Sequence, residues 1–163
     1  MSPKAQKYIS LQVGEKAPEF ELQNADGVSV ALRDLLGKKI VLYFYPKDNT
    51  SGCTLEANEF SGLLGEFNKL GAIVVGVSPD SPKSHTNFIT KHDLRHILLS
   101  DESHEMLTSY GVWGEKSMYG RKYFGVFRTT FLLDEEGKIL QIWEKVKSSG
   151  HAKEVLEALK SVA

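Results

Sequence analysis

Cysteine is almost absent from this sequence of 163 residues, since Cys53 is its only one. A single thiol cannot form an internal disulfide, which excludes a secreted scaffold held together by disulfides. Apolar runs are also short, and the longest, residues 40–45, has the length of one buried strand rather than of a membrane span. The first ten residues lack the apolar stretch of a secretory signal. We therefore expect a cytoplasmic protein that has no contact with a membrane.

An excess of charge of one sign is missing as well. The 20 Lys and Arg residues nearly balance the 21 Asp and Glu residues, and the formal net charge is -1. No strong field would therefore attract nucleic acid or an anionic membrane. The densest basic cluster, formed by Lys145, Lys147 and Lys153, is small enough to be a solvated face. We expect no nucleic-acid partner.

The histidines form no recognisable metal or catalytic pattern. His92 and His96 are four residues apart, but Asp93-Leu94-Arg95 between them reads as the exit of a helix, which argues against a shared metal. No histidine lies in a triad context that would favour a cysteine hydrolase. We expect no metal site and a surface position for each of the five, which are His85, His92, His96, His104 and His151.

Strand and helix signals alternate along the chain. The β-branched and aromatic run 40–45 predicts a central strand covered on both faces, and 72–77 predicts a second. Short alternating runs on either side of Asn24-Ala25-Asp26-Gly27 predict an N-terminal hairpin. The other expected elements are helices at 53–70, 82–92, 103–110 and 150–161, a strand at 97–99, and a hairpin of strands 126–133 and 138–145.

This order of elements predicts an α/β protein with a thioredoxin-like fold: a central mixed β-sheet, helices on both faces and an N-terminal β-hairpin. Because no repeat or linker composition divides the chain, we place one domain at residues 13–163, preceded by a tail at 1–12. Residues 111–125, rich in glycine and aromatic side chains, read as a long loop.

Cys53 occupies an informative position, directly after a strand and a loop and at the start of the expected helix. Thr50 or Ser51 can cap the free amides there. Unpaired N–H groups and the positive end of the helix dipole favour the thiolate, the nucleophilic form of cysteine. The alternative is an inert, buried thiol, although a loop before a helix is a poor place for one.

The segment Pro46-Lys47-Asp48-Asn49-Thr50-Ser51-Gly52-Cys53 matches P-x-x-x-T-x-x-C, the signature of peroxiredoxins. Its surroundings, VLYFYPKDNTSGCTLEANEF, resemble the bacterioferritin co-migratory protein or peroxiredoxin Q branch of that family. So do the N-terminal VGEKAPEFELQNADG and the late FRTTFLLDEEGKI. The resemblance extends from about Val13 to the C-terminus.

The resemblance implies a thiol-dependent peroxidase that acts on hydrogen peroxide and organic hydroperoxides. Cys53 would be the peroxidatic nucleophile and would become a sulfenic acid. Thr50 would hydrogen-bond the thiolate and align the peroxide, and Pro46 would shield the sulfur from water. Arg128 would support the thiolate and the charge developing on the leaving oxygen, with Glu56 orienting that arginine. These groups would act without a metal or an organic cofactor, so we expect no cofactor.

One position departs from the branch. Many members have a resolving cysteine five residues after the first, where this chain has Asn58. The resemblance therefore implies a one-cysteine cycle, in which sulfenylated Cys53 is reduced by an outside thiol: thioredoxin, glutaredoxin, glutathione, or Cys53 of another copy. Without a resolving cysteine in the same chain, Cys53 should be prone to over-oxidation to sulfinic acid.

Two other interpretations compete with the peroxidase. A dithiol oxidoreductase would need C-x-x-C, but the corresponding span begins with Thr50. A peroxide sensor or redox-regulated holdase would use Cys53 stoichiometrically, without efficient turnover. The aromatic residues of 111–125 either line an apolar pocket that favours alkyl hydroperoxides or pack against the core. We expect a monomer or a weak homodimer.

Overall fold

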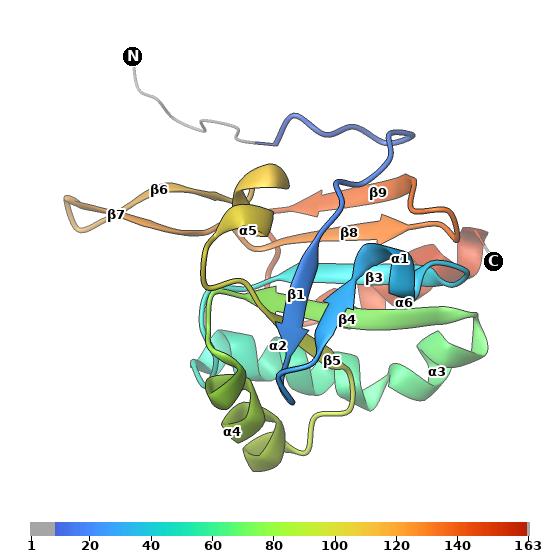
Figure 1. The fold of residues 1–163 in the computed structure, drawn as a ribbon, viewed down its shortest axis with the longest axis horizontal. Helices are drawn as coiled ribbons and strands as arrows, with labels where there is room; N and C mark the ends of the chain where they lie inside the picture. Colours follow the sequence, from blue (N-terminus) through green and yellow to red (C-terminus); the bar gives the residue numbers. More distant parts are fainter. Residues whose placement is uncertain (1–8, 163) are drawn as a thin grey trace.

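The computed structural model describes residues 9–162, and these contain a seven-stranded mixed sheet (Figure 1). Its strands are β1 (Glu21–Asn24), β2 (Ser29–Ala31), β3 (Lys39–Phe44), β4 (Ala72–Ser78), β5 (Ile97–Ser100), β8 (Thr129–Leu133) and β9 (Ile139–Glu144). They lie in the order β2-β1-β5-β4-β3-β8-β9. Strands β3, β4 and β5 are parallel, and every other pairing is antiparallel. The predicted thioredoxin-like, mixed α/β sheet is confirmed.

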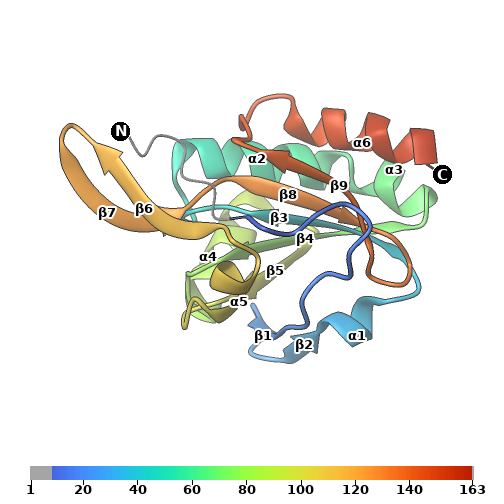
Figure 2. The same ribbon diagram turned by 90° about the horizontal axis from the view of Figure 1, so that it is seen from above.

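Helices cover the sheet on both faces (Figure 2). They are α1 (Leu32–Leu35), α2 (Ser51–Gly62), α3 (Leu64–Lys69), α4 (Pro82–His92), α5 (Glu105–Ser109) and α6 (His151–Val162). Side chains of α2, α3, α4 and α6 share one hydrophobic cluster with the sheet, and those of α1 and α5 share the other. In the part of the chain that the structure describes, no helix combines the length and the apolar composition needed to cross a bilayer.

Strand β3 lies inside the sheet, as its run of apolar residues predicts. Val41 and Tyr43 belong to one hydrophobic cluster, and Leu42 and Phe44 belong to the other. Because successive side chains of a strand point to opposite faces, a strand covered on both faces is apolar throughout. This rigid central strand ends directly before the loop that carries the site.

The N-terminal hairpin of β1 and β2 joins the sheet through an antiparallel pairing of β1 with β5. Its turn is closed by the side chain of Asn24, whose Oδ1 accepts from the amides of Asp26 and Val28. Of the expected tail 1–12, residues 1–8 lie outside the described residues, while Ile9 and Leu11 pack against the core. The division into a tail and a domain at residue 13 stays a prediction.

The prediction of a long loop at 111–125 is wrong, because most of this segment forms a second, two-stranded sheet. Strands β6 (Trp113–Met118) and β7 (Arg121–Val126) pair in antiparallel register around Tyr119 and Gly120, both with positive φ. A two-residue turn with positive φ at both positions matches the twist of a hairpin. The hairpin projects from the body of the molecule (Figures 1 and 2).

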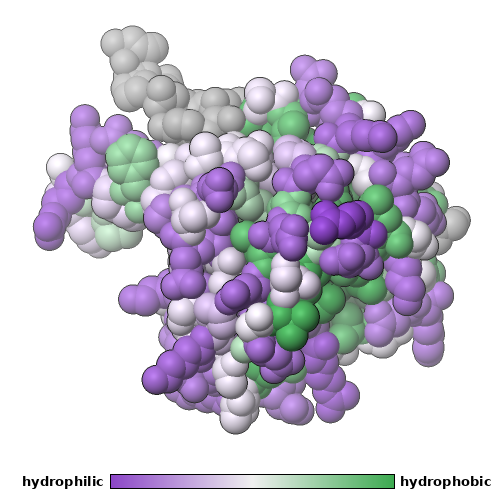
Figure 3. All heavy atoms as spheres, viewed as in Figure 1, coloured by the Kyte–Doolittle hydropathy of each residue, from purple (hydrophilic) through white to green (hydrophobic). Residues whose placement is uncertain are grey.

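The aromatic residues of this segment, expected either to line an apolar pocket or to pack against the core, differ in their burial. At its base, Trp113 packs against the core and stacks on His104 with ring centroids 4.0 Å apart. Tyr119, in the turn at the tip, is 97% exposed. Phe124, which pairs with Glu115 nearer the base, is 64% exposed although its ring centroid lies 6.3 Å from that of Trp113. In Figure 3 the projecting arm carries mainly hydrophilic atoms with a smaller hydrophobic part. Trp113 therefore packs against the core, whereas the side chains of Tyr119 and Phe124 face solvent.

Two further expectations need correction. The helix expected over 53–70 is broken at Leu63, where α2 ends and α3 begins. Glycines at 62 and 65 weaken the helix there, since glycine has a low helix propensity.

Three histidines expected on the surface, His85, His96 and His151, are buried, and each forms hydrogen bonds through both ring nitrogens. Hydrogen bonds from protein groups replace the lost water and permit burial.

Candidate active site

The site forms where β3 ends and α2 begins. Pro46 follows the strand, the loop turns at Asn49 with φ 63°, and α2 starts at Ser51. Cys53 lies in the first turn of α2 and is only 1% exposed. The first helical hydrogen bond runs from the amide of Thr54 to the carbonyl of Thr50, so the preceding amides point out of the helix end. The partial positive charge of this end lies beside the sulfur.

Arg128 supplies a full positive charge to the same sulfur. It lies between β7 and β8, 75 residues from the cysteine, and its Nη2 donates to Cys53 Sγ at 2.9 Å. The backbone around the arginine is held from the C-terminal side, because its carbonyl accepts from the amide of Val146 at 3.1 Å. A guanidinium in contact with sulfur stabilises the thiolate that a nucleophile needs.

Glu56 is the second partner of the Arg128 guanidinium. Its Oε1 accepts from Nη1 of Arg128 at 3.0 Å, and its side chain is 1% exposed. Burial raises the pKa of Glu56 from 4.5 to about 7, and the neighbouring guanidinium opposes this rise. Glu56 and Cys53 lie three residues apart on α2, so one guanidinium bridges adjacent positions of a single helix face.

Gly52 leaves the space that this guanidinium occupies. A Cβ atom at this position would lie 3.1 Å from Nη2 of Arg128 and 3.0 Å from Oγ of Ser148. Both distances are shorter than ordinary van der Waals contacts. The glycine in the first turn of α2 therefore permits the close approach of Arg128 to Cys53.

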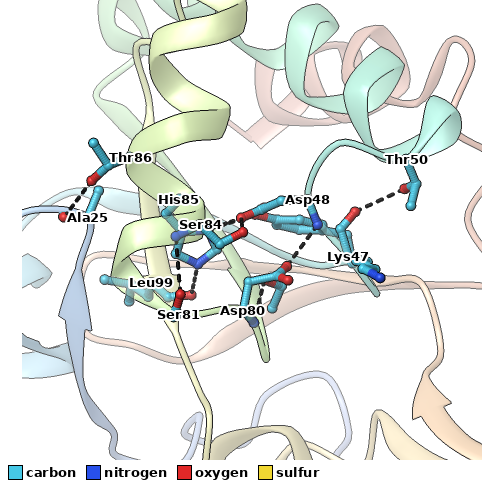
Figure 4. Close-up of polar contacts among 12 residues, drawn as sticks. Ala25, Lys47, Asp48, Thr50, Asp80, Ser81, Ser84, His85, Thr86 and Leu99 are labelled. Atoms are coloured by element: carbon cyan, nitrogen blue, oxygen red, sulfur yellow. Dashed lines mark hydrogen bonds and ion pairs between the residues drawn. The ribbon is translucent and has the colours of Figure 1, made fainter.

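Thr50 and Pro46 lie on the loop before the cysteine. Thr50 is the N-cap residue of α2, but its exposed hydroxyl donates to the carbonyl of Lys47 at 2.9 Å and caps no amide (Figure 4). The expectation of a side-chain cap from Thr50 is therefore wrong, because its hydroxyl instead closes the loop. Pro46 is half-buried. The structure brings Cys53 and Arg128 into direct contact.

A second polar cluster lies on the other side of this loop, and the sequence pattern gave no signal for it. Asp48 and His85, which are 37 residues apart, are both buried and lie 2.7 Å apart. With Asp80 they form a group whose potential metal-ligating atoms lie within 4.8 Å of one another. Hydrogen bonds within the protein engage all three side chains.

The buried thiol at a helix start, held by a guanidinium on a thioredoxin-like sheet, defines the class of thiol peroxidases. The profile of the AhpC/TSA family matches residues 13–142. The chain belongs to the AhpC/TSA family, as a peroxiredoxin of the Bcp or PrxQ branch.

Individual relatives are similar over nearly the whole chain. Peroxiredoxin Bcp of Bacillus subtilis is 44% identical over 155 residues, 95% of this chain and 99% of its own length. A structure of the Xanthomonas campestris bacterioferritin comigratory protein, studied for its alkyl peroxide reduction activity, has a TM-score of 0.86 and 43% identity, covering 92% of this chain and 98% of its own. A mutant of Xylella fastidiosa PrxQ has a TM-score of 0.88 and 37% identity, covering 93% and 96%.

Proposed function

We propose that this peroxidase reduces hydrogen peroxide and organic hydroperoxides through a sulfenic acid on Cys53, which an outside thiol then reduces. The observation that carries the proposal is the 2.9 Å contact between Nη2 of Arg128 and Sγ of Cys53, which is the only cysteine in the sequence. The relative studied for alkyl peroxide reduction supports the inclusion of organic substrates.

In the first step the thiolate of Cys53 attacks the terminal oxygen of the peroxide. The S–O bond forms as the O–O bond breaks, the sulfur is oxidised, and the leaving oxygen takes a proton to become water or an alcohol. Arg128 stabilises the thiolate and the negative charge on the leaving oxygen. Thr50 aligns the peroxide by rotation of its hydroxyl, and Pro46 shields the sulfur from water.

In the second step a thiol from outside the chain attacks the sulfenic sulfur. A mixed disulfide forms and water leaves, and a second thiol then releases Cys53 as thiolate. Thioredoxin, glutaredoxin and glutathione are the candidate donors.

We further propose a cytoplasmic, reducing location and a monomeric or weakly dimeric state. Sedimentation at several protein concentrations would test the oligomeric state.

Peroxide consumption with each thiol donor in turn tests this cycle. Wild-type protein should turn over many equivalents, Cys53→Ser should turn over none, and Arg128→Ala should lose roughly 100-fold in rate, as expected for one electrostatic donor. Oxidation of Cys53 by one equivalent, with no turnover from any donor, would instead favour the peroxide sensor or holdase.

A further inference from the structure

The loop between β3 and α2 is tied to the rest of the molecule through one buried side chain. The carboxylate of Asp48 accepts from the hydroxyl of Tyr45 at 2.6 Å, from that of Ser84 at 2.8 Å, and from Nδ1 of His85 at 2.7 Å. In Figure 4, Ser84 and His85 reach this carboxylate from α4, while Thr50 lies on the opposite side, at the start of α2. The loop is therefore anchored to a second helix.

The side chains of this anchor, Asp48 and His85, have hydrogen-bond partners in several parts of the protein. Nε2 of His85 lies 3.0 Å from the carbonyl oxygen of Leu99, which can only accept. Nδ1 faces a carboxylate that already accepts two hydroxyl donors. Both ring nitrogens of His85 and both oxygens of Asp48 therefore have hydrogen-bond partners inside the protein.

Neighbouring parts of the loop depend on this pair for their position. Lys47, Asn49 and Thr50 are exposed, whereas Asp48 is buried, so its side chain is the inward attachment of residues 47–50. The backbone amide of Asp48 also donates to Oδ2 of Asp80 at 2.8 Å. Fixing Asp48 therefore fixes Asn49, with its left-handed backbone, and the first turn of α2 that follows.

We propose that Asp48 and His85 form a positioning pair that holds the loop in its peroxide-reactive arrangement and limits the access of outside thiols to Cys53. The inference rests on the proposed function and deepens it. Because Cys53 is 1% exposed and no second cysteine exists, an outside thiol reaches the sulfur only when this loop or the first turn of α2 opens. Weakening the contact between Asp48 and His85 should then slow the reaction of Cys53 with peroxide and speed the reduction of its sulfenic acid by an outside thiol.

His85→Gln tests the pair, and His96→Gln is its matched control. His96 is also a buried histidine with both nitrogens bonded, but its partners are the neutral hydroxyls of Tyr43, on β3, and Ser61, near the C-terminal end of α2. Four quantities are measured on each variant and on wild type. They are the rate of oxidation by hydrogen peroxide in stopped flow, the rate of reduction of the sulfenic acid by dithiothreitol, the rate of alkylation by iodoacetamide, and amide exchange over residues 47–53.

For His85→Gln we expect roughly tenfold slower oxidation, from misplacement of the loop, with severalfold faster reduction and alkylation and faster local exchange. His96→Gln should change global stability and leave the ratio of the reduction rate to the oxidation rate near that of wild type. Ser84→Ala removes one neutral donor from Asp48, so it should fold and shift the ratio in the same direction by less.

Equal ratios in His85→Gln, Ser84→Ala and His96→Gln would overturn the inference. Alkylation and amide exchange involve no peroxide chemistry, so they separate this inference from the proposed function. If wild-type protein failed to turn over peroxide, the proposed function would fail. Faster alkylation confined to His85→Gln and Ser84→Ala would still support the positioning pair.

Discussion

The guanidinium of Arg128 is shared between two groups that compete for its charge, the sulfur of Cys53 and the carboxylate of Glu56. With Glu56 ionised, the carboxylate fixes the orientation of the guanidinium but also partly neutralises it. With Glu56 protonated, more of the positive charge is available to the sulfur. The raised pKa of Glu56, about 7, places the change between these two states near neutral pH.

The pH dependence of stability tests this assignment through Glu56→Gln. Burial raises the pKa of Glu56 from 4.5 to about 7 in the folded protein, so the folded state binds the proton more tightly than the unfolded chain does. The stabilisation is complete below about pH 4.5 and is lost as the pH rises through about 7. The free energy of unfolding of wild type, minus that of Glu56→Gln, should fall by up to about 1.4 kcal/mol per pH unit across this interval.

Denaturant unfolding of both proteins at several pH values within this interval measures the difference. Other buried groups also titrate, such as His96, whose pKa burial lowers to about 3. These groups are common to both proteins and cancel in the subtraction. Parallel stability curves would show that Glu56 keeps an ordinary pKa.

At the scale of elements, α2 brings together the cysteine, the glutamate and the gap at Gly52. Gly52→Ala should push the guanidinium away by a few tenths of an ångström, because the added Cβ would lie 3.1 Å from Nη2. We expect the rate of peroxide reduction to fall by roughly tenfold. Stopped-flow oxidation of Cys53 measures the effect.

Gly62→Ala is the matched control on the same helix, since no atom of residues 9–162 lies within 4 Å of a Cβ added there. It should leave the oxidation rate unchanged and stabilise α2 by up to about 1 kcal/mol through its higher helix propensity. Similar losses of activity in both variants would mean that a general property of α2, and not the approach of Arg128, controls the rate.

Elements with one dominant signal could be predicted from the sequence, and those without one could not. Strand β3 was predictable because 40–45 is apolar throughout, and α4 because Pro82 and Asp93 mark its two ends. The hairpin of β6 and β7 was missed because its residues are mostly exposed and alternate poorly, and because its turn, Tyr119-Gly120, lacks the usual Asn-Gly.

The site divides in the same way. Cys53 and Thr50 lie close together on a local motif, and Arg128 could be named from a second motif, although no spacing in the sequence predicts a contact over 75 residues. The pair of Asp48 and His85 depends on how α4, which packs against β5, meets the loop that follows β3. Only the folded structure could reveal it, because a single sequence carries no signal for a pair brought together by tertiary packing.

At the scale of the whole molecule, the chain combines a deeply buried thiol with the lack of any internal thiol to reduce it. Asn58 is exposed on α2, five residues after Cys53. Five residues of α-helix span about 7.5 Å along the axis, more than the roughly 4.4–6.8 Å between the Cα atoms of a disulfide. A thiol at this position could therefore bond to Cys53 only after the first turns of α2 unwind.

Asn58→Cys shows whether these turns unwind during the reaction. If they do, one equivalent of peroxide should produce an internal disulfide, with less helical signal in circular dichroism and less over-oxidation to sulfinic acid than in wild type. Non-reducing mass spectrometry identifies the bond. Glu66→Cys, an exposed position on α3, should give no such bond. If the thiol introduced at position 58 stayed free after oxidation, α2 would remain folded, and the outside reductant would have to reach Cys53 through movement of the loop that Asp48 anchors.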